Sequence, residues 1–201
     1  EKPLAGSLED ADRMVEECRS RDIPFVGGLV ARNYPDYWQA RDLIEAGELG
    51  DVLQVTAQWR SNLSSGGSHL VDTVRYLAGG NVEWVFGEME SDEAAAGDED
   101  IMGNGYLAFD NGVRAFVRSM PCGEVGGVDI EVSAEKGRIR CRETPPQFKL
   151  IRLGTPAPYG EEFRGPSPRM QAPLPVRYPI PLPPQVQGMG LTVVEDLIQA
   201  I

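Results

Sequence analysis

Basic residues, histidine, cysteine and long apolar runs are all scarce in this 201-residue sequence. The 19 lysines and arginines are outnumbered by 31 aspartates and glutamates, which leaves a formal charge of −12. Because that charge repels phosphate backbones and anionic lipid surfaces, we expect no nucleic-acid partner and no membrane partner. No apolar run is long enough to cross a bilayer, and no apolar segment typical of a secretory signal follows the charged first residue. The sequence therefore predicts a cytoplasmic protein.

The sequence lacks the residues that a metal site or a set of disulfides would need. The three cysteines, Cys18, Cys122 and Cys141, are odd in number and far apart, and a single histidine cannot complete a Cys/His cluster. We therefore expect reduced thiols, as is typical of the cytosol, and no metal. The first residue is not methionine, so we also expect further residues upstream.

The first fifty residues alternate helix and strand patterns in the way that is typical of a parallel α/β sheet. Ser7 begins a capping-box pattern that is followed by apolar residues at helical spacing, which predicts a first helix. Residues 23–26 predict a short buried strand. A second helix is expected over residues 35–46, with Gly47 at its C-terminal cap.

From residue 51 onward the pattern changes to strands separated by turns. Apolar and polar residues alternate over 53–59, a helix is expected at 68–78, and residues 110–112 (Asp-Asn-Gly) are a strong hairpin signal. Further strands are expected at 82–90, 103–109, 113–120, 128–134 and 138–142. These features predict an α+β fold. Residues 1–50 would form an α/β unit, with a domain boundary near Gly50, and residues 51–201 a large, predominantly antiparallel open sheet with helices on one face.

Proline dominates the last quarter of the chain. Residues 145–184 hold twelve of the sixteen prolines, which excludes a helix or a central strand there. We interpret this stretch as an extended segment that lies over the domain, and a disordered loop is the alternative. Residues 191–201 have the pattern of the start of a helix.

The only histidine, His69, stands at the expected start of the helix over residues 68–78, directly after two glycines and a serine. His69, Asp72 and Tyr76 share one face of that helix. The glycines favour a histidine that is exposed to a cleft, and Asp72 would favour its protonated form. The alternative is a histidine that only caps or pads the helix.

The chain opens with Glu1-Lys2-Pro3, which would place a lysine at a strand end, where α/β proteins bind ligands. A Lys-Pro step is otherwise common in loops. Taken together, the sequence resembles the Gfo/Idh/MocA family of glucose–fructose oxidoreductase, inositol dehydrogenase and their relatives. Four stretches carry the resemblance: Glu1-Lys2-Pro3-Leu4-Ala5; Arg32-Asn33-Tyr34-Pro35 with the helix that ends in Ile44-Glu45-Ala46-Gly47-Glu48-Leu49-Gly50-Asp51-Val52; Gly67-Ser68-His69-Leu70-Val71-Asp72 with Leu77-Ala78-Gly79; and Gly105 to Phe109 with Gly112-Val113.

The resemblance implies an NAD- or NADP-dependent oxidoreductase that acts on a CH–OH group of a sugar, polyol or related hydroxy compound. It also implies that residues 1–50 are the C-terminal remnant of a dinucleotide-binding Rossmann domain and that residues 51–201 form a substrate-binding and dimerisation domain. It implies that Lys2 and His69 are catalytic, with His69 taking the hydroxyl proton and Lys2 reaching the substrate hydroxyl and the nicotinamide ribose. The cofactor-binding residues would be Glu1, Lys2 and Pro3. The substrate-binding residues would be Ser65, Asp72, Tyr76 and Arg32.

Two departures from the family pattern limit what the resemblance implies. No Gly-x-Gly-x-x-Gly loop stands between a strand and a helix, so we expect the cofactor site to lie largely outside this chain, and the choice between NAD and NADP stays open. Many members have an aspartate four residues before the histidine, where this chain has Ser65. A serine cannot stabilise an imidazolium by charge, so the substrate stays open as well, although Asp72 could partly substitute.

Two other functions remain at this point. One is an NAD-dependent glycoside-cleaving enzyme of the same family, which net turnover of free cofactor would distinguish. The other is a non-catalytic binding or oligomerisation protein, which Ser65 favours and which Lys2 and His69 oppose. A sheet with one uncovered, partly apolar face also predicts a homo-oligomer that associates through that face.

Overall fold

The computed structural model describes residues 1–97, 99–120, 127–142 and 147–152. It contains helices, short helical turns and strands in the order α1 (Leu8–Ser20), η1 (Val30–Asn33), α2 (Pro35–Glu45), β1 (Val52–Gln58), η2 (Leu63–Gly67), α3 (Ser68–Ala78), β2 (Val82–Met89), α4 (Asp92–Ala95), β3 (Gly103–Phe109), β4 (Arg114–Arg118), β5 (Asp129–Ala134), β6 (Gly137–Arg142) and β7 (Gln147–Arg152).

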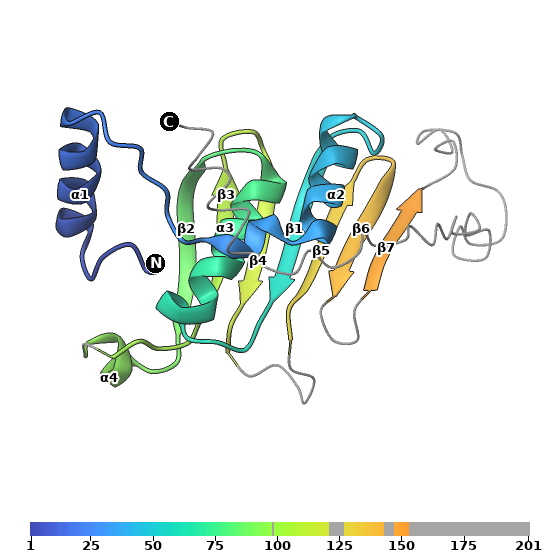
Figure 1. Ribbon diagram of the computed structural model, residues 1–201. Helices are drawn as coiled ribbons and strands as arrows, with labels where there is room; N and C mark the ends of the chain where they lie inside the picture. The colour runs from blue at the N-terminus through green and yellow to red at the C-terminus, as the bar shows by residue number, and fades with distance from the viewer. Residues whose placement is uncertain (98, 121–126, 143–146, 153–201) are drawn as a thin grey trace, which may run out of the picture.

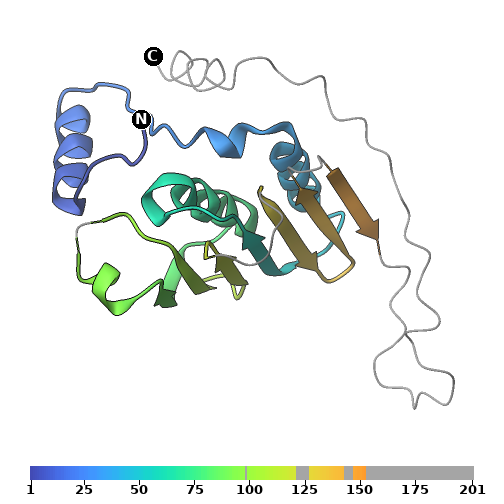
Figure 2. The ribbon, with the colours of Figure 1, turned by 90° about the horizontal axis from the view of Figure 1, so that it is seen from below.

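Seven strands form one mixed sheet in the order β2-β3-β4-β1-β5-β6-β7 (Figure 1). β1 and β4 run parallel, because the chain crosses over through α3, β2 and β3 between them. The other neighbouring pairs are antiparallel. α2 and α3 lie on one face of the sheet, and no helix of the described residues covers the other face (Figure 2). The predicted open, predominantly antiparallel sheet with helices on one face is therefore confirmed.

Local signals in the sequence set the ends of several elements as expected. The Ser7 hydroxyl accepts the backbone N–H of Asp10 at 3.1 Å and caps α1. Gly47 follows α2 with a φ of +69°, a backbone angle that favours glycine. Gly112 turns the β3–β4 hairpin with a φ of +88°, and its N–H donates to Phe109 O at 3.0 Å.

The core lies between the helices and the covered face of the sheet. Leu70, Val74 and Leu77 of α3 are at most 1% exposed. α3 packs on β1 and β4, where Val55 and Ala115 are fully buried. Since these apolar residues fix the rotation of α3, they also decide which of its polar side chains face away from the core.

The predicted buried strand at residues 23–26 is wrong. This segment forms no strand, and Ile23 and Phe25 are 50% and 38% exposed. An extended segment is stable only when a neighbouring strand accepts its backbone hydrogen bonds and covers its side chains, and none of the described strands lies beside it. α1 has no buried residue either, and it stands apart from the sheet in both views (Figures 1 and 2).

The proline-rich stretch contributes one strand that its composition did not predict. β7 pairs with β6 at the edge of the sheet, in a segment that itself contains no proline. The rest of that stretch, the helix expected at 191–201 and Cys122 lie outside the described residues. Cys18 is a half-buried free thiol on α1, and Cys141 is a buried one on β6.

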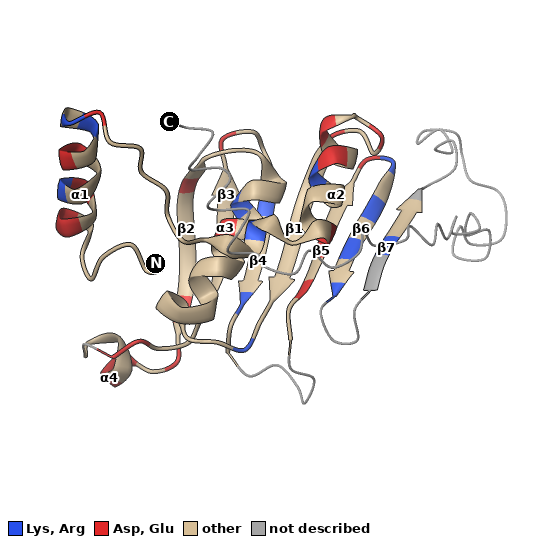
Figure 3. Cartoon of the chain, in the orientation of Figure 1, with Lys and Arg blue, Asp and Glu red and all other residues tan. Residues whose placement is uncertain are grey.

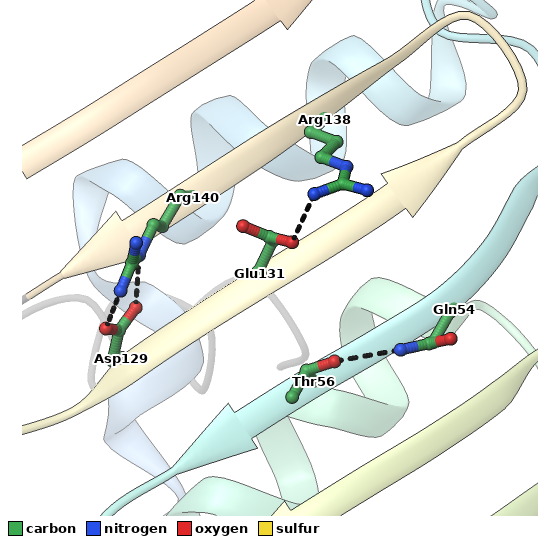
Figure 4. Close-up of polar contacts among 6 residues, drawn as sticks. All are labelled: Gln54, Thr56, Asp129, Glu131, Arg138 and Arg140. Atoms are coloured by element: carbon green, nitrogen blue, oxygen red, sulfur yellow. Dashed lines mark hydrogen bonds and ion pairs between the residues drawn. The ribbon is translucent and has the colours of Figure 1, made fainter. Parts of the chain in front are cut away.

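The open face of the sheet differs between its two edges. Across β2, β3 and β4 it carries a row of aromatic rings, with centroids 5.5 Å apart between Trp84 and Tyr106 and 4.8 Å apart between Tyr106 and Phe116. Toward the other edge, β5 and β6 carry charged side chains (Figure 3). These charges form the ion pairs Arg140–Asp129 and Arg138–Glu131, beside a hydrogen bond between Gln54 and Thr56 (Figure 4).

Candidate functional site

The turn before α3 brings its backbone close to β1, and two glycines make this approach possible. A Cβ at Gly66 would lie 2.8 Å from Cη2 of Trp59, and one at Gly67 would lie 3.0 Å from the carbonyl oxygen of Asn62. The Gly66 N–H also donates to the Ser61 hydroxyl at 2.8 Å. The two glycines that mark the motif in the sequence therefore allow α3 to begin directly above the end of β1.

His69 stands in the first turn of α3 as a half-buried side chain. Its ring centroid is 6.5 Å from that of Trp59, and both side chains line a pocket of about 150 Å³ with the aromatic residues Tyr34 and Tyr37. Nδ1 of His69 is buried and has no hydrogen-bond partner among the described residues. The expected cleft beside this histidine is present and has mainly apolar walls.

The pKa of His69 is lowered from its ordinary value of about 6.5, chiefly by burial and next by the positive charge of Lys2. Asp72 raises the same pKa, as its position three residues along predicts, but burial and Lys2 outweigh it. The expected effect of Asp72 is therefore present, but the net shift has the opposite sign. At neutral pH the imidazole is mainly uncharged and can accept a proton.

Lys2 lies on the other side of α3. With Glu1 and Pro3 it lines a second pocket, of about 290 Å³, whose wall from α3 includes Ser68 and Asp72. The structure therefore brings Lys2 close enough to affect His69 electrostatically, while the two side chains line different pockets on different faces of one helix.

The backbone of Glu1, which adjoins Lys2, is packed against a glycine. A Cβ at Gly28 would lie 3.0 Å from Cα of Glu1, 3.1 Å from its carbonyl carbon and 3.2 Å from its nitrogen. A backbone neighbour cannot move aside as a flexible side chain can. Gly28 is therefore required for Glu1 and Lys2 to lie where they do.

Three of the predicted substrate residues form a cluster with one another. Asp72 is 5% exposed, and both of its carboxylate oxygens accept from Arg32, with Arg32 Nε to Asp72 Oδ2 at 2.8 Å. The Arg32 guanidinium lies 5.6 Å from the ring centroid of Tyr76, and Arg41 lies at the same distance from that ring. These contacts join η1 to α3 and α2. The carboxylate of Asp72 acts on His69 through its charge while it binds Arg32.

The fourth predicted substrate residue, Ser65, is exposed in the turn before α3. Its carbonyl oxygen accepts from the Ser68 hydroxyl at 2.7 Å, and its N–H donates to Asp100 Oδ2 at 3.0 Å. Sequence reasoning missed Asp100, because it lies 35 residues further along the chain and no local pattern marks it.

The described residues contain no group of three or more histidine, cysteine, aspartate or glutamate side chains placed to hold a metal ion. None of the helices in the described part of the chain has the length and apolar character to cross a bilayer. The polar groups of the site are therefore ordinary side chains of α3, η1 and the first residues.

Comparison with known proteins places this arrangement in a family. The profile of the GFO/IDH/MocA C-terminal domain matches residues 37–140. A myo-inositol 2-dehydrogenase from Thermotoga maritima is 31% identical over 159 residues, which are 69% of this chain and 47% of that protein. A 2,7-anhydro-N-acetylneuraminate hydratase from Mediterraneibacter gnavus is 32% identical over 123 residues, which are 51% of this chain and 33% of that protein. The chain thus spans less than half the length of these curated relatives.

Solved structures share the fold. An inositol dehydrogenase homolog from Azotobacter vinelandii, crystallised with NADH and myo-inositol, superposes with a TM-score of 0.66 at 19% identity, over 77% of this chain and 47% of that one. The matching profile covers the helices α2 and α3 and the sheet up to β6, and therefore the histidine motif as well. The chain belongs to the Gfo/Idh/MocA family and contains that family's C-terminal domain.

Proposed function

We propose that the protein containing this chain is an NAD-dependent dehydrogenase that oxidises a hydroxyl group of a sugar, a polyol or a related compound. One observation carries the proposal: a half-buried imidazole with a lowered pKa stands in a pocket, close to a lysine charge, at the motif that the family profile covers. The relative from Thermotoga maritima, named as a myo-inositol 2-dehydrogenase, and the fold neighbour that holds NADH and myo-inositol support the substrate class and the cofactor.

His69 is the proposed general base. Oxidation of an alcohol to a carbonyl requires that the hydroxyl proton and a hydride both leave, and a bound nicotinamide ring would accept the hydride. The neutral imidazole of His69 accepts the proton. Burial, with Trp59 as a neighbour, lowers the pKa of His69 and so favours the uncharged imidazole that a base requires.

Lys2 is the proposed electrostatic partner. Its charge lowers the pKa of His69 from the neighbouring pocket. From the same place it would stabilise, through its charge, the negative charge that develops on the substrate oxygen as the proton leaves. Lys2 and Pro3 are joined by a cis peptide bond and line the second pocket with Glu1. Asp72 and Arg32 are proposed to hold α3 and η1 in place through their ion pair. Of the two, only Asp72 lines this pocket, where it is proposed to contact substrate.

The residues of this chain suit only the nicotinamide end of a dinucleotide. The pocket at Lys2 has a cationic side chain and a backbone wall at Gly28, whereas the sequence contains no glycine-rich loop between a strand and a helix for the pyrophosphate. We therefore propose that the phosphates are bound by a part of the protein outside this chain. The same absence leaves NADP possible in place of NAD.

A second candidate is a lyase or hydratase reaction on a sugar, with transient oxidation by a retained cofactor. The relative from Mediterraneibacter gnavus that is named as a hydratase favours it. The same base could serve both reactions, because each removes a proton from a carbon atom or an oxygen atom of a sugar. Net turnover of free cofactor separates the two.

Self-association through the open sheet face is proposed for the same protein. The aromatic row on this face includes Trp84 and Phe116, which are 49% and 42% exposed, and Phe86 on the edge strand is 72% exposed. Exposed aromatic side chains in one row are costly in water and are buried when a second sheet covers them. Light scattering of the full-length protein tests this, and a monomer at micromolar concentration would contradict it.

A substrate screen tests the proposed activity. Full-length protein is incubated with NAD and a panel of free polyols, hexoses and sugar acids, and reduction of the nicotinamide is followed by absorbance. We expect net reduction in stoichiometric excess over enzyme with at least one member of the panel. Product formation without net reduction would support the second candidate, and no conversion of any panel member would reject both.

A further inference from the structure

A distant carboxylate holds the turn that leads into α3. The Ser64 N–H donates to Asp100 Oδ1 at 2.8 Å, and the Ser65 N–H donates to Asp100 Oδ2 at 3.0 Å. The Leu63 N–H donates to the Ile101 carbonyl oxygen at 2.8 Å and joins the same two segments. The segment just before β3 thus accepts three consecutive backbone N–H groups of η2.

This turn needs such a partner because it is not a continuous part of the helix. Ser65 departs from helical backbone angles, with φ −77° and ψ −108°, so the chain kinks there before α3 begins. Hydrogen bonds to an ionised carboxylate are roughly twice as strong as neutral ones. Asp100 therefore fixes the place and direction in which α3 starts.

His69 is the second residue of α3, so its depth in the structure depends on where the helix begins. The Ser68 hydroxyl donates to the Ser65 carbonyl oxygen at 2.7 Å and ties the kink to the first turn of the helix. On the other side, the imidazole faces Trp59. We propose that Asp100 is a positioning residue for His69: its carboxylate fixes the Ser64–Ser65 turn and, through it, the depth of the imidazole beside Trp59. The catalytic meaning of this role rests on the proposed function, whereas the positioning itself does not.

Positioning and direct charge make opposite predictions for Asp100. The charged groups that act on His69 are Lys2 and Asp72, and Asp100 is not one of them. If Asp100 acted through its charge, its removal would lower the pKa of His69. If it positions the ring, its removal loosens the turn and exposes the imidazole, and the pKa rises because burial is the main cause that lowers it.

The single histidine of this chain makes the test direct. The imidazole of His69 is titrated by NMR in the wild-type chain and in Asp100→Asn, which keeps the shape of the side chain and removes its charge. We expect the titration midpoint of His69 to rise toward about 6.5 in this variant. We also expect faster hydrogen exchange of the Ser64 and Ser65 amides.

Asp110→Asn is the matched control. Asp110 is also exposed and also accepts a backbone N–H, that of Asn81 at 2.9 Å, but it does so beyond the far end of α3. This variant should leave the midpoint of His69 unchanged even where thermal unfolding shows a similar loss of stability. A midpoint that rises equally in both variants would mean that general loosening moves it, and would overturn the positioning role.

An unchanged or lowered midpoint in Asp100→Asn would overturn the proposal as well. If that variant does not fold, Asp100→Glu provides the test, because it keeps the charge and displaces the carboxylate by one methylene. The midpoint must then still rise, and an unchanged midpoint rejects the role. Since no enzyme activity is measured, failure here is distinct from failure of the proposed dehydrogenase.

Discussion

Residues 1–29 and the sheet with its helices contain similar apolar patterns and differ sharply in burial. In the first region Leu8 is 85% exposed and Ile23 is 50% exposed, whereas in the second Leu70 is 1% exposed and Val55 is fully buried. The comparison teaches that an apolar pattern predicts the type of an element but not its burial, which requires a partner surface. The two regions nevertheless meet at α3, where Lys2 from the first affects His69 in the second.

The largest expected effect follows from truncating the core of the second region. Phe109 is 1% exposed, and Phe109→Ala should lower the free energy of unfolding by about 3–5 kcal/mol through lost burial and a new cavity. Leu8→Ala in α1 is the control, and we expect a change within about 0.5 kcal/mol. Urea unfolding measures both. Equal effects would mean that the first region is buried in solution and that the comparison is wrong.

The ion pair between η1 and α3 lies just after the first region and should respond asymmetrically to mutation. Arg32→Ala leaves the Asp72 carboxylate, which is 5% exposed, without its partner. Asp72→Ala leaves a guanidinium whose side chain is 43% exposed and can be hydrated. We therefore expect a loss of about 2–3 kcal/mol for Arg32→Ala and about 1 kcal/mol for Asp72→Ala. If urea unfolding shows a larger loss of stability for Asp72→Ala than for Arg32→Ala, the unpaired Asp72 carboxylate is not the main cost of breaking this ion pair.

A smaller effect tests the approach of the first residues to the second region. Gly28→Ala would bring a Cβ to 3.0 Å from Cα of Glu1 and displace the adjoining Lys2. The lysine charge would then lower the pKa of His69 less, so the NMR titration midpoint of His69 should rise. Gly27→Ala is the matched control, because a Cβ there meets nothing within 4 Å. If the midpoint stays the same in both variants, the charge of Lys2 does not act on the pKa of His69.

The smallest expected effect is a pH dependence of stability. Because the folded-state pKa of His69 lies below its unfolded value, the unfolded chain binds more protons in the range just below about pH 6.5. Stability should therefore fall as the pH falls through this range toward the folded-state pKa. Thermal unfolding of the wild type and of His69→Gln at a series of pH values isolates the contribution. A slope that persists unchanged in His69→Gln would assign it to other groups.

The sequence predicted the elements whose signals are local. The alternation over residues 53–59, the hairpin at Gly112 and the helix that bears His69 all depend on near neighbours, and the structure has all three. The strand expected at residues 23–26 fails because its stability depends on a sheet that the described residues do not supply. The boundary proposed near Gly50 stays a prediction, although α2, which precedes it, already packs on α3 and β6.

The site was predictable in its parts and not in its contacts. The motif around His69 identifies the histidine, and the charge of Lys2 acts on it, but the two side chains line different pockets, so the shared site that the resemblance implies stays a prediction. The effect of Asp72 on the pKa of His69 was predictable from their spacing, whereas the larger effect of burial was not, because the pocket beside Trp59 is not visible in the sequence. Asp100 was missed because a contact across 35 residues leaves no local pattern.

The central claim is that His69 is the base of a dehydrogenase, and steady-state kinetics test it most directly. Once the screen has supplied a substrate, the full-length wild-type protein is compared with His69→Ala, and the thermal unfolding of both is measured. Removal of a general base typically costs about a hundred- to ten-thousand-fold in rate, so kcat should fall by that order while the KM for NAD and the melting temperature change little. A His69→Ala protein that keeps most of its activity would contradict the account.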